Sequence, residues 1–339
     1  MKKVKFGKFT IGRGYPCVII MEVADSHGGS VEIAKKMIDQ AKLNGADIVK
    51  FQFHLPDLEM VPGSIQMWDG SLYDILKKNL LSPEDHRILK EYCDSQNIMY
   101  LCTPFSMQAS DELEKIGVEV FKIGSGEMNN LPMIRHIAKK GKTMMISTGM
   151  STIDEIKETV KVVEEENCPY VLAHCVSEYP TKAESLNLGL IEKYQEEFKV
   201  PVGFSSHALG IYCEIAAVAL GANFIEKHFT LDKKQKGPDH FISIEPMELK
   251  EMSLAIHEIE KGLGNKKVVS KEEQVVRDWA YHSVVTNQSI EAGTVLTKEM
   301  LTVKRPGSGI PAKELEKVIG RKLKIKTNKD TILQWNNLE

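Results

Sequence analysis

Short apolar runs alternate with longer amphipathic stretches along the first three quarters of the chain. Runs rich in β-branched residues predict strands, whereas apolar residues spaced three and four positions apart predict helices. Strands are expected at residues 18–23, 48–53, 99–103, 120–123, 143–148, 170–174, 202–205 and 224–229, with helices including 31–44, 83–96, 106–116, 153–166 and 211–220 between them. This alternation predicts an α/β fold, a TIM (β/α)8 barrel over residues 1–264.

The pattern changes after residue 264. A charged stretch at residues 265–282 is expected to be a linker that runs over the surface. Residues 283–339 contain predicted short strands at 283–286, 302–304 and 322–325, a helix at 312–318, and turn-rich sequence between them. A module of this size buries little surface alone, so we expect a small α+β domain that docks on another surface.

Composition and charge exclude several classes of function. The chain has 339 residues, of which 42% are hydrophobic and 27% charged, and its formal net charge is −3. No basic field is therefore available for nucleic acid, and no apolar run approaches the roughly 20 residues of a membrane span. The N-terminal lysines are not followed by the apolar segment of a signal peptide, which predicts a cytoplasmic protein. The six cysteines are scattered, which predicts buried, reduced thiols.

Two lysines lie inside predicted strands: Lys50 in the second strand and Lys122 in the fourth. A lysine among β-branched residues is costly to bury unless it is paired. Because both would point into one barrel, we expect them to converge on an anionic ligand such as a phosphate or carboxylate. The alternatives are a structural ion pair with a strand carboxylate such as Glu226, and Schiff-base chemistry at Lys122.

Further polar residues collect where the predicted strands end, which is the end of a TIM barrel that carries the chemistry. Glu22 closes the first strand and suits sugar hydroxyls or proton transfer. Hydroxyls and turn amides in Thr103-Pro104-Phe105 and Ser147-Thr148-Gly149-Met150 suit phosphate oxygens. In later loops, Asp239 could bind a sugar hydroxyl or cap a turn, and Arg305 could bind a carbonyl-bearing ligand or remain a solvated charge.

A pair of histidines is the strongest local signal. His207 and His228 follow the seventh and eighth predicted strands, so both rings can point into one cavity. Two neutral imidazoles with oxygen ligands and water describe an open divalent-metal site that can polarise a carbonyl. His174 ends the sixth strand and is either a third ligand or a residue that packs against the barrel.

The ordered set of these motifs resembles the bacterial sialic acid synthases over nearly the whole chain, and the C-terminal part resembles their antifreeze-like (SAF) domain. The resemblance rests on Glu22, Lys50-Phe51-Gln52, Thr103-Pro104-Phe105, residues 121–127, residues 147–150, residues 174–181, Ser205-Ser206-His207, residues 226–230, residues 237–240 and residues 304–309. It implies condensation of phosphoenolpyruvate with an N-acetylmannosamine-type sugar, which gives a nine-carbon 2-keto acid and phosphate.

The resemblance also implies roles for individual residues. Phosphoenolpyruvate would be held by Lys50, Thr103, Lys122, Ser125, Ser177 and Ser205. His207 and His228 would bind Mn2+ or Mg2+, and Glu127 would lie near the metal-bound water and handle its proton, with Glu22 the next candidate. Glu22, Tyr179 and Asp239 would contact the sugar, and Arg305 would reach the N-acetyl group from the partner subunit of a domain-swapped homodimer.

Three positions depart from the family pattern. Ser26 replaces a usual Asn, and Ser206 and Ala208 flank His207 where Asp and Thr are common. Ser206 is expected to leave His207 without its usual hydrogen-bond partner, which would weaken metal binding. Because these departures lie near the sugar and the metal, they favour the phosphoenolpyruvate assignment over any particular sugar, and legionaminic or pseudaminic acid stays an alternative product to sialic acid. A Schiff-base aldolase acting through Lys122 and a non-catalytic sugar-binding barrel are the competing interpretations.

Overall fold

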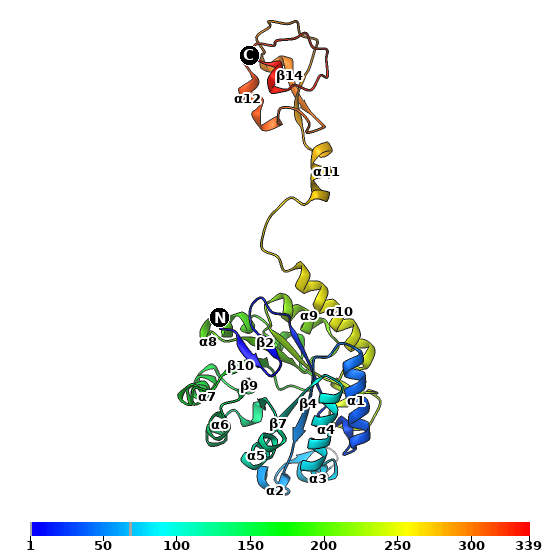
Figure 1. Cartoon of the computed structure of the whole chain (residues 1–339), viewed down its shortest axis with the longest axis vertical. Coiled ribbons are helices and arrows are strands. Elements are labelled where there is room, and N and C mark those ends of the chain that lie inside the picture. Colours follow the sequence, from blue (N-terminus) through cyan, green and yellow to red (C-terminus); the bar gives the residue numbers. More distant parts are fainter. Residues whose placement is uncertain (1, 68–69) are drawn as a thin grey trace. The chain divides into compact units, whose positions relative to one another are not determined.

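The computed structural model describes residues 2–67 and 70–339, and it divides the chain at Gly264 into two compact units. Figure 1 shows a barrel in the first unit and, in the second, an extended segment followed by a helix and a smaller domain. None of the helices in the described residues is long and apolar enough to cross a membrane. All six cysteines are free, and all but Cys213 are buried.

In the part of the chain that the structure describes, eight parallel strands close into a barrel in the order β10-β11-β12-β3-β4-β7-β8-β9. The strands are β3 Val18–Glu22, β4 Ile48–Phe53, β7 Met99–Pro104, β8 Val120–Ile123, β9 Thr143–Ser147, β10 Tyr170–Cys175, β11 Val202–Ser206 and β12 Phe224–His228. Each lies within one residue of its expected bounds, which confirms the predicted TIM barrel.

Amphipathic helices follow the barrel strands and cover their outer faces. They are α1 Val31–Leu43, α4 Pro83–Ser95, α5 Met107–Ile116, α6 Leu131–Ala138, α7 Ile153–Glu165, α8 Leu190–Phe198, α9 Tyr212–Ala219 and α10 Pro246–Gly262. Helix α4 shows why such helices begin where they do, since Ser82 and Asp85 form a reciprocal capping box ahead of its first turn. The segment between β4 and α4 adds two short helices, α2 Pro56–Glu59 and α3 Leu72–Lys78, and two short strands that pair antiparallel, β5 Gln66–Met67 and β6 Gly70–Ser71.

An antiparallel hairpin precedes the barrel and was not predicted. Its strands are β1 Val4–Phe6 and β2 Phe9–Ile11. Phe6 and Ile11 are fully buried in a cluster with the inward-facing apolar side chains of the barrel, and the Phe6 ring stacks on Phe224 at 6.5 Å. The amino-terminal part of the barrel interior is therefore a packed apolar plug, and the polar chemistry is confined to the carboxyl-terminal part.

The second unit, Asn265–Glu339, has its own apolar core, which includes Val284, Leu301, Leu323 and Leu333. The strands β13 Ser283–Thr286 and β14 Leu301–Lys304 pair antiparallel, in agreement with the predicted strands. The helix expected at residues 312–318 consists of the 3-10 turn η6 Ala312–Glu314 followed by α12 Leu315–Val318.

One expectation for this unit was incomplete and one was wrong. The segment expected to be a linker over the surface is exposed along nearly its whole length, and it contains helix α11 Lys271–Ala280, which begins with a capping box of Ser270 and Glu273. The strand expected at residues 322–325 is absent from the described structure. Lys322 and Leu323 make single bridges to two different partners, Val295 and Leu338, so no continuous ladder forms.

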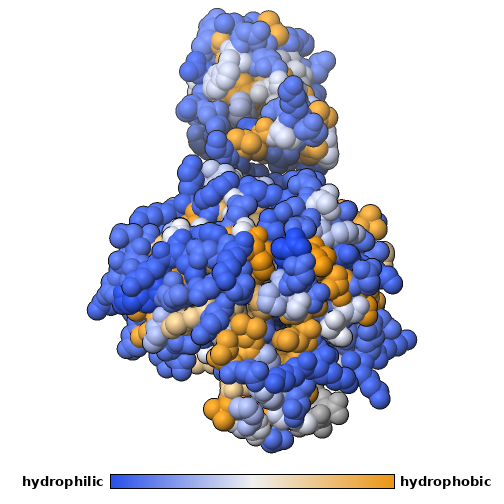
Figure 2. Space-filling model, turned by 60° about the horizontal axis from the view of Figure 1, so that its bottom comes forward, coloured by the Kyte–Doolittle hydropathy of each residue, from blue (hydrophilic) through white to orange (hydrophobic). Residues whose placement is uncertain are grey.

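In the view of Figure 2 the surface is mainly hydrophilic, with hydrophobic residues gathered in part of the barrel unit. Several large apolar side chains in loops that follow the carboxyl ends of the strands are exposed, namely Met150, Tyr179, Leu209 and Phe241. The loops around the polar end of the barrel therefore combine a buried polar interior with apolar side chains outside it.

Candidate active site

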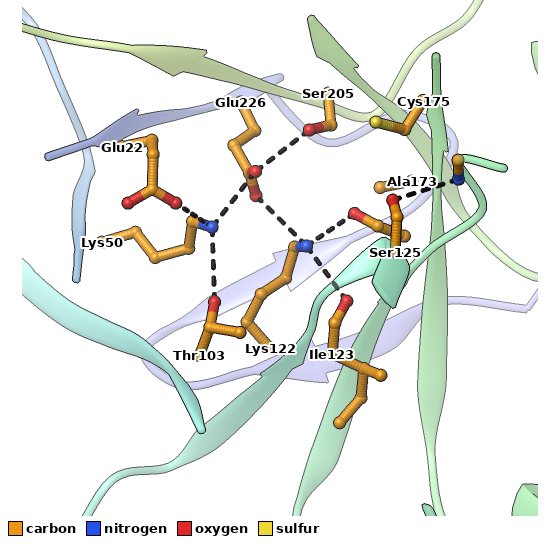
Figure 3. Close-up of polar contacts among 12 residues, drawn as sticks. Glu22, Lys50, Thr103, Lys122, Ile123, Ser125, Ala173, Cys175, Ser205 and Glu226 are labelled. Carbon is orange, nitrogen blue, oxygen red and sulfur yellow. Dashed lines mark hydrogen bonds and ion pairs between the residues drawn. The ribbon is translucent and has the colours of Figure 1, made fainter. Parts of the chain in front are cut away.

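The two strand lysines converge at the carboxyl-terminal end of the barrel interior, where they meet two carboxylates. Lys50 forms ion pairs with Glu22 and with Glu226, the latter at 3.2 Å between Lys50 Nζ and Glu226 Oε1. Lys122 Nζ lies 4.0 Å from Glu226 Oε2. Figure 3 shows Glu226 between the two lysines, with all four side chains coming from different strands. Each of the four residues is less than a tenth exposed.

The groups of this cluster differ in how strongly their surroundings favour the ionised form. Burial opposes ionisation of Glu226, but Lys122 and Lys50 hold the pKa of that carboxyl down at about 2. Burial raises the pKa of Glu22 above its ordinary value, although Lys50 opposes the shift. Burial lowers the pKa of Lys122, with Glu226 opposing. Glu226 is therefore the firmly ionised counter-ion of the cluster, whereas Glu22 takes up a proton more readily.

Hydroxyl groups surround the lysines. Lys50 Nζ donates to Thr103 Oγ1 at 3.4 Å, and Lys122 Nζ donates to Ser147 Oγ at 2.5 Å. Ser205 Oγ donates to Glu226 Oε1 at 3.0 Å. These inward positions follow from the alternation of side chains along a strand, since residues two apart share a face. The interior thus holds cations and hydroxyl donors together, which suits an anion with several oxygens.

A small cradle adjoins this cluster at the turns after β8 and β9. Ser125 begins the 3-10 turn η2 Ser125–Glu127, and its Oγ accepts the backbone N–H of Gly149 at 3.2 Å. A Cβ atom at Gly149 would lie 2.4 Å from Ser177 Oγ and 2.6 Å from Ser125 Oγ. A larger residue here would therefore displace one or both serine hydroxyls, a requirement for glycine that the sequence interpretation did not identify.

Glu127 ends the same turn, next to Gly124. Its Oε2 atom is buried and has no hydrogen-bond partner among the described residues. Burial raises the pKa of Glu127, and Lys122 opposes the shift. A carboxyl group with an unused buried oxygen close to the lysine cluster can exchange a proton with a bound ligand or water.

His207 and His228 lie side by side at the ends of β11 and β12, with ring centroids 5.5 Å apart. His207 Nδ1 donates to the carbonyl oxygen of Val176 at 2.7 Å, which leaves Nε2 with a free lone pair. The Nδ1 atom of His228 is buried without a hydrogen-bond partner in the described residues. Burial lowers the pKa of both rings, that of His207 to about 4.

These two imidazoles fit a divalent cation, because both are neutral and each offers an unused nitrogen. Within residues 2–67 and 70–339, no group of three or more His, Cys, Asp or Glu side chains is arranged to hold a metal ion. A metal here would therefore take its remaining ligands from water or substrate oxygen atoms. His174 is turned away, since its Nε2 bonds to the Leu186 carbonyl at 2.6 Å and its ring packs on Phe204, so it is a packing residue.

Ser206 does not leave His207 without a hydrogen-bond partner, so that part of the expectation was wrong, whereas weaker metal binding stays a prediction. Ser206 lies on the opposite face of β11 from Ser205, so its hydroxyl faces the helix layer and not the cavity. Its Oγ accepts the backbone N–H of Ala208 at 3.3 Å. His207 obtains its hydrogen bond from the Val176 carbonyl instead, and it does not lack a partner. The third departure, Ser26, is a buried hydroxyl without a hydrogen-bond partner in the described residues.

Of the residues assigned to the sugar, Glu22 ends strand β3, whereas Tyr179 and Asp239 lie in loops that follow barrel strands. Tyr179 stacks on His207 with ring centroids 4.0 Å apart. Asp239 precedes the turn η4 His240–Ile242, and burial together with the carboxylates of Asp25 and Glu22 raises its pKa to about 7.

Arg305 follows β14 in the second unit. Its Nε donates to the Ala280 carbonyl at 3.0 Å, and its guanidinium lies 5.7 Å from the centre of the Trp279 ring. These contacts tie the Arg305 loop to the end of helix α11. The side chain remains exposed and keeps its other donors available.

Comparison with known proteins agrees with this arrangement. Residues 37–268 match the family model described as the NeuB family, and residues 281–339 match the SAF domain. The chain is 35% identical over 347 residues to N,N'-diacetyllegionaminic acid synthase of Legionella pneumophila, which covers 97% of this chain and 96% of that protein. It is 37% identical over 336 residues to N-acetylneuraminate-9-phosphate synthase of Homo sapiens, which covers 96% and 93%.

A solved structure gives the same result. N-acetylneuraminic acid synthetase from Leptospira borgpetersenii superimposes with a TM-score of 0.76 and 32% identity, covering 81% of this chain and 95% of that one. The predicted combination of a TIM barrel with a C-terminal SAF domain is confirmed. This chain belongs to the NeuB family of sialic acid synthases.

Proposed function

We propose that the chain condenses phosphoenolpyruvate with an N-acetylmannosamine-type sugar to form a nine-carbon 2-keto sugar acid and inorganic phosphate. The convergence of Lys50 and Lys122 among hydroxyl donors inside the barrel is the observation that carries this proposal. Phosphoenolpyruvate is a small trianion, and paired buried ammonium groups with hydroxyl donors match its carboxylate and phosphate oxygens. Relatives that make diacetyllegionaminic acid, N-acetylneuraminate 9-phosphate and pseudaminic acid define the class of product.

The residues divide between the two substrates. Phosphoenolpyruvate would be held by Lys50, Thr103, Lys122, Ser125, Ser177 and Ser205. Glu22, Tyr179 and Asp239 would contact the sugar, whose open-chain aldehyde would lie toward His207 and His228. The cradle formed by Ser125 and Ser177 beside Gly149 supports this assignment, because it places two hydroxyl donors close together for phosphate oxygens.

The reaction joins C3 of phosphoenolpyruvate to the aldehyde carbon of the sugar. Water then adds at C2, and the resulting tetrahedral intermediate expels phosphate to leave the 2-keto acid. Lys50 and Lys122 offset the negative charge that the ligand brings into the barrel. Glu127 would take the proton from the attacking water, for which its unpaired buried oxygen is suited.

A divalent metal, Mn2+ or Mg2+, would be held by His207 and His228 and would polarise the aldehyde oxygen. The orientation of His207 by the Val176 carbonyl and the unpaired Nδ1 of His228 support this metal site. Both imidazoles are neutral because burial lowers the pKa of each, and neutral rings are the form that ligates metals.

We further propose a homodimer in which Arg305 of one subunit reaches the sugar held by the barrel of the other. The distribution of charge along the chain supports this proposal. Residues 265–339 contain 14 Lys and Arg against nine Asp and Glu, whereas the chain as a whole carries a net charge of −3, so the barrel unit is acidic and the second unit basic. Opposite net charges favour association of such surfaces.

The test is phosphate release from phosphoenolpyruvate by the purified full chain with Mn2+. N-acetylmannosamine, its phosphate ester and 2,4-diacetamido-6-deoxy hexoses are each supplied, with and without EDTA. Release with one sugar, abolished by EDTA, is the expected result. The variant Lys122→Met should lose activity. Lys142→Met should not, because Lys142 precedes β9 and its side chain bonds to the Val118 carbonyl ahead of β8, at the amino-terminal ends of these strands.

One observation favours a second candidate, a Schiff-base aldolase. Burial lowers the pKa of Lys122, and the neutral amine is the nucleophilic form of lysine. This candidate predicts a pyruvate adduct on Lys122 that borohydride traps, with activity that EDTA leaves unchanged. Ligand binding without release of phosphate or formation of an adduct would instead identify a non-catalytic sugar-binding barrel.

A further inference from the structure

A buried ion pair between a lysine and a glutamate lies outside the barrel interior, near the strand ends that carry the two histidines. Lys227 and Glu214 are fully buried, and Lys227 Nζ lies 2.7 Å from Glu214 Oε1. Lys227 belongs to β12, and Glu214 belongs to the first turn of α9, so the pair sits between the barrel and its helix layer. Neither residue contributes to the polar cluster inside the barrel.

The remaining hydrogen bonds of Lys227 go to the residues on either side of His207. Its Nζ donates to the Ala208 carbonyl and lies 3.5 Å from Ser206 Oγ. Ser206 and Lys227 are also the last register partners of β11 and β12, immediately before His207 and His228. Lys227 therefore joins the two strand ends at the point where the ladder stops.

Other contacts fix His207 from the opposite side. The Thr181 N–H donates to the His207 carbonyl at 3.1 Å, and the Val176 carbonyl accepts from the ring at 2.7 Å. Without Lys227, the carbonyl of Ala208 would lose its buried donor, and the segment that follows β11 would lose its link to β12. The backbone on both sides of His207 is thus held by groups from separate elements.

A fully buried ion pair contributes little net stability, since desolvation offsets most of the attraction between the charges. Hydrophobic side chains are the usual filling between a barrel strand and its covering helix. The pair at Lys227 and Glu214 is therefore better explained by what its hydrogen bonds orient than by the stability that it adds.

We propose that Lys227, neutralised by Glu214, is a positioning residue that sets the spacing of His207 and His228 for a divalent cation. This inference rests on the proposed function, because it concerns the metal site of that reaction. Lys227 does not touch the substrates or the metal. It acts through the backbone at residues 206–208.

The experiment measures Mn2+ binding by the electron paramagnetic resonance signal of free Mn2+, without substrates. It compares the wild-type full chain with Lys227→Met and with the double variant Lys227→Met/Glu214→Leu. The double variant replaces the pair by apolar side chains, so it should recover the thermal stability that the single variant loses. Both variants are expected to bind Mn2+ about 10- to 100-fold more weakly than the wild type, the usual effect of losing groups that orient metal ligands.

Lys140→Met is the matched control. Lys140 is also largely buried and bonds to Asp111 at 2.5 Å and Glu114 at 2.6 Å, but these partners lie on helix α5. Its loss should leave Mn2+ affinity unchanged. A stable double variant with wild-type Mn2+ affinity would overturn the positioning role while leaving the metal site intact. A wild-type chain that binds no Mn2+ would instead overturn the metal site of the proposed function, and the positioning role with it.

Discussion

At the scale of single residues, Glu127 combines a buried oxygen that lacks a partner with a pKa that burial raises. Glu127→Gln keeps the shape of the side chain but removes its ability to take a proton. We expect kcat for phosphate release to fall about 10²- to 10⁴-fold, while KM for phosphoenolpyruvate changes little. Steady-state kinetics at saturating sugar check this result. An unchanged kcat would assign the proton transfer to another group, with Glu22 the next candidate.

Asp239 gives a prediction for pH and stability. Burial, followed by the carboxylates of Asp25 and Glu22, raises its pKa to about 7 from the ordinary 3.8. The folded chain thus holds this proton where the unfolded chain has lost it, so the stability from this group falls as the pH rises from about 4 to about 7. Asp239→Asn removes the penalty and should raise Tm relative to the wild type by clearly more at pH 8 than at pH 5. Thermal unfolding at both values tests this, and an equal difference at both would contradict it.

The role of a residue could be predicted from the sequence where a charged side chain must be buried and therefore needs a partner of opposite charge. Lys50 and Lys122 stand in apolar strands, so their convergence on negative charge follows from the cost of an unpaired buried ammonium. The effect of Ser206 could not be predicted, because it depends on which face of β11 the residue occupies and on a carbonyl, that of Val176, from a different strand end. Side-chain identity alone does not contain that information.

At the scale of elements, the turn after β9 depends on Gly149. A Cβ there would come within 2.6 Å of both Ser125 Oγ and Ser177 Oγ. Gly149→Ala should push these hydroxyls apart and raise KM for phosphoenolpyruvate about tenfold, equivalent to roughly 1.4 kcal/mol of binding. Gly126→Ala is the control, since a Cβ at Gly126 meets nothing within 4 Å. Equal effects of the two substitutions on KM would show that the cradle does not bind the ligand.

The elements differ in how far their own sequence determines them. The barrel strands and the five helices given by residue range were predicted closely, because each carries a clear apolar pattern bounded by capping or turn residues. The hairpin of β1 and β2 was missed, since its short strands acquire an apolar environment only when the barrel closes around Phe6. Residues 322–325 are the opposite case, because their sequence has the pattern of a strand but no neighbouring segment pairs with them continuously.

At the scale of the whole molecule, the proposed dimer requires a barrel and an Arg305 from different subunits to form one site. Co-expression of two inactive variants tests this requirement. Arg305→Ala has an intact barrel and lacks the arginine, whereas Lys122→Met has the arginine and an inactive barrel. In a mixed dimer with exchanged domains, the intact barrel meets the intact arginine, so random pairing should restore about a quarter of wild-type activity.

The alternative arrangement gives a different result with the same variants. If each barrel used the Arg305 of its own chain, no pairing of the two variants would bring an intact barrel together with an arginine. Activity of the co-expressed pair would then equal the average of the two variants alone. Affinity tags on the two chains allow the mixed dimer to be isolated, which separates failure to dimerise from failure to complement. Because opposite charges favour association, the mixed dimer should dissociate more readily as salt rises.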